Sequence, residues 1–115
     1  QSHGIDDLRA LALIQRARVP IWADTSTRET LITRFGYCFQ APEGSPYPPI
    51  LERHAMDVPN PIVVDRPGGT IATHPFKVEH GATPTLGFRI DNLAYTPDLN
   101  SIPDESLSAL EGLDC

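Results

Sequence analysis

The chain has 115 residues, of which 40% are hydrophobic and 21% charged, a composition typical of a globular domain rather than of a disordered segment. Its formal net charge of −6 argues against binding to a nucleic-acid backbone, which requires a basic surface. No apolar stretch approaches the roughly 20 residues of a membrane span. Two cysteines do not make a disulfide scaffold, so we expect Cys38 and Cys115 to be free thiols in a cytoplasmic protein. One domain over residues 1–115 is predicted.

The first elements predicted along the chain are a helix and a strand. Apolar residues at helical spacing predict a helix over Gly4–Arg18, with Asp6 and Asp7 in its first turn, where they favour the helix dipole. The apolar run Val19–Ala23 predicts a buried strand, with Trp22 in the core.

A second helix is predicted next. Ser26 and Glu29 have the spacing of a capping box, and Gly36 is a typical C-terminal stop, so the helix should end near Phe35. The Pro-rich stretch Tyr37–Pro49 predicts an irregular loop. A strand followed by a helix and another strand indicates an α/β layer architecture.

The second half of the chain is mostly short extended segments. Asp91-Asn92 is a typical two-residue hairpin turn, and a last helix is predicted over Glu105–Leu110. The predicted strands are Ile50–His54, Ile62–Val64, Thr70–Thr73, Phe76–Glu79, Leu86–Ile90 and Leu93–Tyr95.

Two side chains with metal-binding chemistry follow predicted strands. His80 comes after Phe76–Glu79, with a loop expected from there through Pro84, and Asp98 comes after the hairpin. Strand ends are where a sheet enzyme aims polar groups at a shared site. By spacing alone, a single His and a single Asp at strand ends are more often turn formers or surface residues than members of a shared site.

The motifs VEHG, LGFRI and AYTPD, together with HGIDDLR at His3–Arg9, resemble the middle of a metallo-β-lactamase-fold hydrolase. The resemblance is strongest to the phosphoribosyl 1,2-cyclic phosphate phosphodiesterases and their bacterial relatives. It implies an αββα sandwich of mixed sheets flanked by helices. This chain would be an internal part of that fold, with both ends missing.

The resemblance also implies an activity: hydrolysis of a small phosphodiester or cyclic phosphate by a water bound to two divalent metal ions, zinc or manganese. His80 would be a metal ligand, and Asp98 would bridge the two ions. The expected partner is a small phosphorylated substrate, without nucleic acid or membrane, and a homodimer is left open.

One position departs from the family pattern. Gln1 stands where the last histidine of the HxHxDH motif is expected, and an amide is a poorer ligand than imidazole for such metals. His3 and Arg9 are further candidates for contacting the metal or the substrate. The alternative function is a metal- or nucleotide-binding module of the same fold with a degenerate, non-catalytic site.

Overall fold

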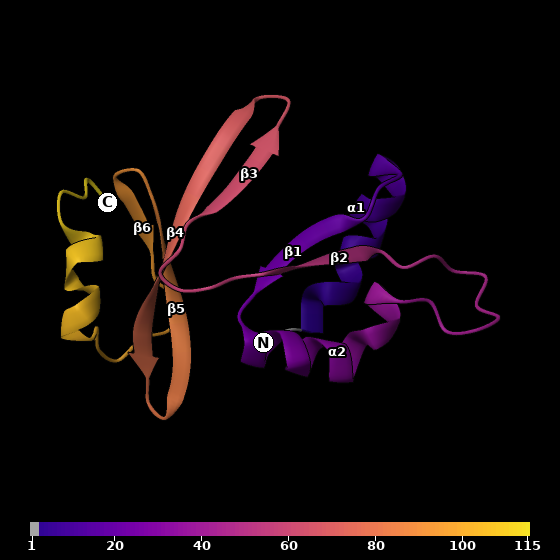
Figure 1. Cartoon of the computed structure of the whole chain (residues 1–115), viewed down its shortest axis with the longest axis horizontal. Coiled ribbons are helices and arrows are strands. Elements are labelled where there is room, and N and C mark those ends of the chain that lie inside the picture. Colours follow the sequence, from indigo (N-terminus) through magenta and orange to yellow (C-terminus); the bar gives the residue numbers. More distant parts are fainter. Residues whose placement is uncertain (1–2) are drawn as a thin grey trace. The chain divides into compact units, whose positions relative to one another are not determined.

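The computed structural model describes residues 3–115, with side chains from Gly4 onward. Contacts group the chain into two compact units, one ending at Met56 and the other beginning at Asp57. The expectation of a single domain stays a prediction. The elements, shown in Figure 1, are the 3-10 helices η1 (His3–Asp7) and η2 (Asp104–Leu110), the helices α1 (Leu8–Gln15) and α2 (Thr25–Phe39), and the strands β1 (Val19–Ala23), β2 (Leu51–Ala55), β3 (Ile62–Arg66), β4 (Gly69–His80), β5 (Thr83–Ile90) and β6 (Leu93–Tyr95).

The first unit is built on a β–α–β motif. Strands β1 and β2 pair in parallel, with Val19 opposite Leu51 and Ala23 opposite Ala55, and α2 makes the crossover between them. The core cluster contains Ile5 and Ala12 from the N-terminal helices, Leu31 and Cys38 from α2, and Ala23, Ile50 and Leu51 from the sheet region. Because side chains alternate along a strand, Ala23 and Leu51 share one face of the sheet, and both helices pack on that face.

The opposite face of the β1–β2 sheet carries Trp22 stacked on His54, with ring centroids 4.9 Å apart. The His54 Nε2 atom lies 3.3 Å from Glu52 Oε1 on the same strand. The expectation that Trp22 belongs to the core was wrong. It is half-buried, because odd-numbered residues of β1 face the helices and Trp22 faces the other way.

The predicted first helix divides into two elements. A 3-10 turn precedes α1, and α1 ends at Gln15 because Arg16 adopts the left-handed conformation with φ 52°. The Ala17 N–H then bonds to the Ala12 carbonyl at 3.2 Å. Ile14 is 81% exposed, so it does not belong to the buried face of α1.

Helix α2 begins and ends differently from the prediction. Its N-cap is Asp24, whose Oδ1 accepts from the Thr27 N–H at 2.7 Å, so Ser26 is already inside the helix. The helix also continues past Gly36 to Phe39, across a kink at Phe35 with φ −131° and ψ 32°. The Pro-rich segment that was expected to begin at Tyr37 therefore starts three residues later.

The second unit is an antiparallel sheet in the order β3-β4-β5-β6. Two predicted strands and the His-Pro pair between them form one strand, β4. Pro75 is tolerated there because its nitrogen faces away from β5, in the same direction as the N–H of Glu79. On that side the pairing with β3 ends at Thr73, so no N–H is required of residue 75.

Two tight turns set the register of this sheet. The predicted turn at Asp91-Asn92 is confirmed, with Asp91 at φ 50° and Ile90 opposite Leu93. The loop expected from His80 through Pro84 was wrong. Gly81 and Ala82 make a two-residue turn, with Gly81 at φ 60°, so that β5 begins at Thr83.

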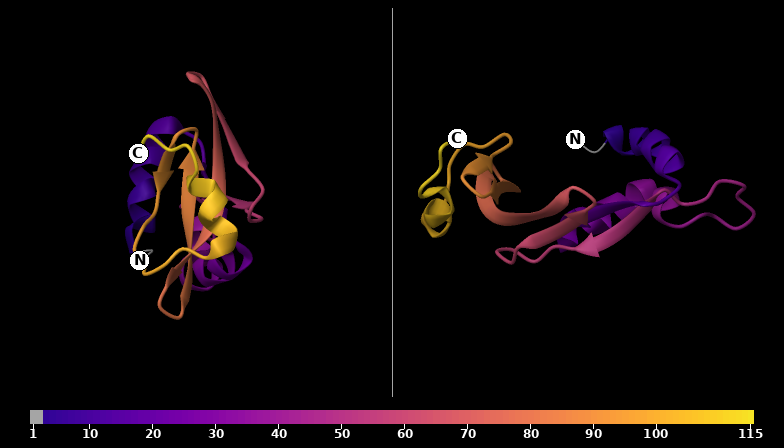
Figure 2. Two further views of the ribbon diagram at one scale, coloured as in Figure 1. Left: turned by 90° about the vertical axis from the view of Figure 1, so that its left-hand side faces the viewer. Right: turned by 90° about the horizontal axis from the view of Figure 1, so that it is seen from above.

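Helix η2 is attached to the sheet by polar contacts, and Figure 2 shows it beside the strands. Arg89 Nη1 donates to the carbonyls of Ala109 at 2.8 Å and Glu111 at 2.7 Å, and Lys77 Nζ lies 3.2 Å from Glu105 Oε1. No helix in the described part of the chain is both long and apolar enough to span a bilayer.

Candidate metal site

His80 is the last residue of β4 and pairs with Thr83 across the Gly81-Ala82 turn. The alternation along β4 places it on the same face of the sheet as Phe76 and Val78, which are buried. The imidazole itself is exposed, beyond the edge of these apolar residues. His80 is therefore held by a regular strand and a tight turn rather than by a long loop.

The segment that follows Asp98 returns to the end of β4. The Asn100 N–H donates to the Glu79 carbonyl at 2.7 Å, and the Glu79 N–H donates to the Ser101 carbonyl at 3.0 Å. The Gly81 N–H donates to Asn100 Oδ1 at 2.9 Å. The backbone segments that carry His80 and Asp98 thus lie side by side, although the distance between the two side chains stays a prediction.

Asn100 is a functional candidate that the sequence reasoning missed. Its backbone bonds to the residue before His80, and its side chain bonds to the residue after it. The signal available in the sequence was an Asn in the loop that follows the last strand, because Asn side chains readily bond to backbone groups of turns. Asn100 fixes the backbone on both sides of His80.

The described residues do not form a complete metal site. A catalytic zinc ion is typically held by three protein ligands, and the part of the chain that the structure describes contains no group of three or more His, Cys, Asp or Glu side chains suited to a metal. His80 and Asp98 offer an imidazole and a carboxylate, which are suitable donors. Gln1 and the side chain of His3 lie outside the described residues.

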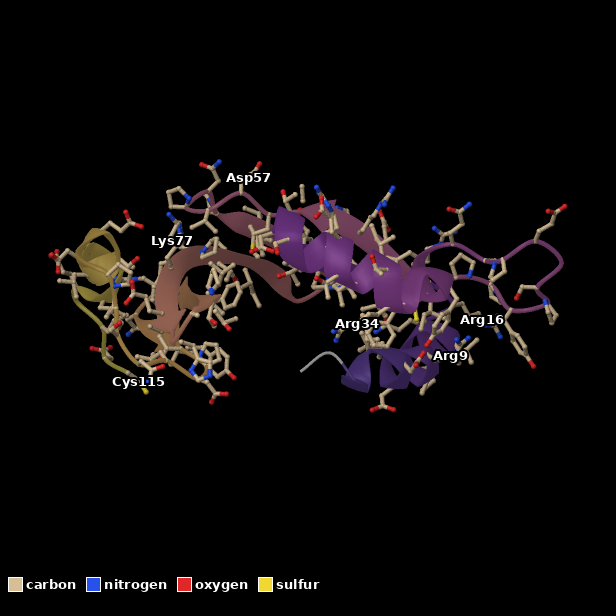
Figure 3. The ribbon with its side chains drawn as sticks, turned by 90° about the horizontal axis from the view of Figure 1, so that it is seen from below. Arg9, Arg16, Arg34, Asp57, Lys77 and Cys115 are labelled. Atoms are coloured by element: carbon tan, nitrogen blue, oxygen red, sulfur yellow. The ribbon has the colours of Figure 1, made fainter. Side chains whose placement is uncertain are left out.

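Arg9, which is labelled in Figure 3, is a half-buried residue of α1, and its role in contacting the metal or the substrate stays a prediction. Arg89 has different surroundings. Its Nη1 bonds to η2 and its Nε donates to the Asp91 carbonyl at 2.7 Å, so its donors already hold the sheet and helix together.

A hydrogen-bonded group around the carboxylate of Asp6 was also missed. Asp6 was assigned to the helix dipole, but its Oδ2 accepts from the Tyr37 hydroxyl at 2.6 Å and its Oδ1 lies 3.6 Å from the Cys38 Sγ. The bond to Asp6 raises the pKa of Tyr37 to about 12. Asp6 therefore ties the N-terminal turn to the last turn of α2, beyond the kink at Phe35.

We expect the first unit to become less stable at alkaline pH because of Tyr37. The folded-state pKa of Tyr37 is raised from 10.0 to about 12. The stability that Tyr37 contributes to the folded state is therefore fully present below pH 10 and is lost as the pH rises through about 12. Spectrophotometric titration at 295 nm, compared between wild type and Tyr37→Phe, should isolate one phenol titrating near pH 12. In Asp6→Asn that titration should move back toward pH 10, and an unmoved titration would contradict the assignment.

We expect the two thiols to differ in the folded protein. Cys38 is 0% exposed, and burial followed by the hydrogen bond to Asp6 raises the pKa of its thiol, whereas Cys115 is exposed. Because the thiolate is the reactive form, Ellman's reagent should titrate Cys115 rapidly and Cys38 only after denaturation. Cys115→Ser should abolish the rapid phase. Two rapid thiols in the native wild type would show that the core around Cys38 is open.

Comparison with known proteins defines the class of protein. The model of the beta-lactamase superfamily domain matches residues 1–115, and the chain belongs to this family. The predicted α/β fold with mixed sheets and flanking helices is thereby confirmed.

One solved structure and one curated relative make the similarity more specific. The structure is described as a new diphosphatase from the PhnP family, and it matches with 32% identity and a TM-score of 0.73 over 97% of this chain and 39% of that one. An octanoyltransferase of Porphyromonas gingivalis is 26% identical over 110 residues, which are 94% of this chain and 20% of that protein. The chain thus spans a fifth to two fifths of the length of these relatives.

Proposed function

We propose that this protein is a metal-dependent hydrolase of small phosphodiesters or cyclic phosphates. The observation that carries the proposal is the hydrogen-bonded pairing of the end of β4 with the segment after Asp98. His80 follows Glu79 directly and Asp98 lies two residues before Asn100, so the pairing supports a shared site for the two side chains in this member of the beta-lactamase superfamily. The similarity to a diphosphatase supports phosphate ester chemistry in particular.

The roles proposed for the residues follow from their positions. His80 would hold one metal ion through its neutral imidazole, and Asp98 would share its carboxylate between two ions, zinc or manganese. When bound, the metal lowers the pKa of a coordinated water and polarises the phosphoryl oxygen. Asn100 keeps the backbone on either side of His80 fixed, so that the imidazole does not have to be ordered again at each turnover.

We do not propose acyl transfer as an activity of this chain. The match to the octanoyltransferase covers 20% of that protein, so its name does not say which part performs that reaction. The second candidate is a metal- or nucleotide-binding module without catalysis, which Gln1 at an expected ligand position favours.

Metal analysis of the full-length protein separates these candidates. We expect close to two equivalents of zinc or manganese, and hydrolysis of bis(p-nitrophenyl) phosphate that is lost with a chelator and restored by either ion. One equivalent with activity would support a mononuclear enzyme. Nucleotide binding without metal or turnover would support the non-catalytic module and overturn the proposal.

A further inference from the structure

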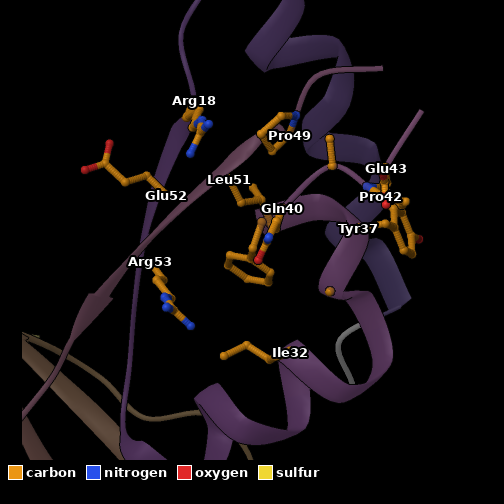
Figure 4. A pocket seen from close by; sticks show the side chains of 13 residues that line it. Arg18, Ile32, Tyr37, Gln40, Pro42, Glu43, Pro49, Leu51, Glu52 and Arg53 are labelled. Carbon is orange, nitrogen blue, oxygen red and sulfur yellow. The ribbon is translucent and has the colours of Figure 1, made fainter. Parts of the chain in front are cut away.

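The first unit contains an open cavity of about 910 Å³ between α2, the Pro-rich segment after it and β2. Its size is within the range of small-molecule sites. None of the residues that line it is among those we connect with metal binding. Figure 4 shows its walls, which include the apolar side chains of Ile32, Pro42, Pro49 and Leu51. Phe39 also lines the cavity.

Two guanidinium groups border this cavity. Arg18 precedes β1 and Arg53 is on β2, and Figure 4 shows both turned toward the space between the strands and α2. Within residues 3–115, neither has an ion pair or hydrogen bond from its side chain. An arginine has five N–H donors that match a carboxylate or phosphate, so the unengaged donors here are available to an anion from outside.

The acidic residues near the cavity do not neutralise these arginines. Glu52 borders the cavity, but its side chain turns to the other face of β2, where it lies 3.3 Å from His54. Glu43 lies beside Pro42 in the Pro-rich segment, across Gln40 from Arg53. The strand side of the cavity, which carries both arginines, is therefore locally positive in a chain whose net charge is −6.

We propose that this cavity binds a small ligand with one carboxylate or phosphate group on an apolar body. Arg53 would hold the anionic group, Arg18 would add positive charge along the same wall, and the Gln40 amide would donate to the anionic group or to a neighbouring oxygen. The apolar part would cover Ile32 and Phe39, which line the same cavity. Two cations beside an apolar wall favour such a ligand over a neutral one, because a neutral ligand leaves the arginines unengaged. They also favour it over inorganic phosphate, because phosphate leaves the apolar wall uncovered.

The test uses 1-naphthoate and its neutral analogue naphthalene-1-carboxamide, titrated calorimetrically into the full-length protein. Naphthoate should bind at least tenfold more tightly than the carboxamide, since a charge-assisted hydrogen bond contributes about one factor of ten or more in affinity. Arg53→Gln should remove most of this preference, and Arg18→Gln part of it. Raising the salt from roughly 0.05 M to 0.5 M should weaken naphthoate binding alone.

Matched variants make the outcome decisive. Arg34→Gln removes the same charge from α2 outside the cavity lining, so it should leave naphthoate affinity within about twofold of wild type. Glu43→Gln should leave it unchanged or raise it slightly. Equal affinity for the two probes, no measurable naphthoate binding, or an equal loss in Arg34→Gln and Arg53→Gln would overturn the proposal. These results would not depend on metal binding or on turnover.

Discussion

Replacement of Gly87 by alanine should destabilise the second unit by about 3 kcal/mol, the upper end of the usual cost of inserting a methyl group into a packed site. Gly87 lies opposite Phe76 in the β4–β5 pairing. A Cβ atom at this position would lie 2.4 Å from the Cζ atom of Phe76. The ring is 4% exposed and has little room to move away, so the strands would have to separate locally. Urea denaturation followed by circular dichroism measures the effect.

Two further variants distinguish this cause from a general effect of removing glycine. Gly68→Ala adds the same methyl group in the same unit where no atom lies within 4 Å, and its stability should stay within about 0.5 kcal/mol of wild type. Phe76→Leu combined with Gly87→Ala should lose less than the sum of the single changes, because the ring that obstructs the methyl group is absent. Additive losses would contradict the proposed contact.

Asp98→Asn in the full-length protein should lower the hydrolysis of bis(p-nitrophenyl) phosphate by more than about 100-fold. Loss of a residue that merely supports a metal ligand typically costs 10- to 100-fold, and loss of a ligand should cost more. An amide of the same shape lacks the negative charge that would hold two cations together. Elemental analysis should show at least one metal equivalent missing, while the circular dichroism spectrum stays close to that of the wild type.

Asp91→Asn is the matched control for this change. Asp91 stands in the β5–β6 turn with φ 50°, a conformation that asparagine adopts readily, so the same loss of charge occurs at the other end of β6. Turnover and metal content should stay within about twofold of wild type. Unchanged turnover and metal content in Asp98→Asn would remove Asp98 from the site.

Local sequence patterns determined the elements whose signals are local. The strand Val19–Ala23 has the predicted boundaries. Its apolar run lies between the end of one helix and the N-cap of the next, so the strand cannot extend further in either direction. The Asp91-Asn92 turn was predicted because few residue pairs adopt its backbone angles at low cost. The family motifs also identified the fold and singled out His80 and Asp98 as candidate site residues.

Tertiary structure decided the features that depend on partners distant in sequence. Asp6 is bonded to Tyr37, 31 positions away, and Asn100 to Gly81, 19 positions away, and no periodicity in the sequence indicates either contact. Pro75 lay between two predicted strands, and only the pairing of β4 shows that its nitrogen faces away from β5, so that the strand continues through it. Local propensity fixes which backbone conformations a segment can adopt, but packing and hydrogen bonding to distant segments select among them, and these contacts also hold the residues proposed for the site.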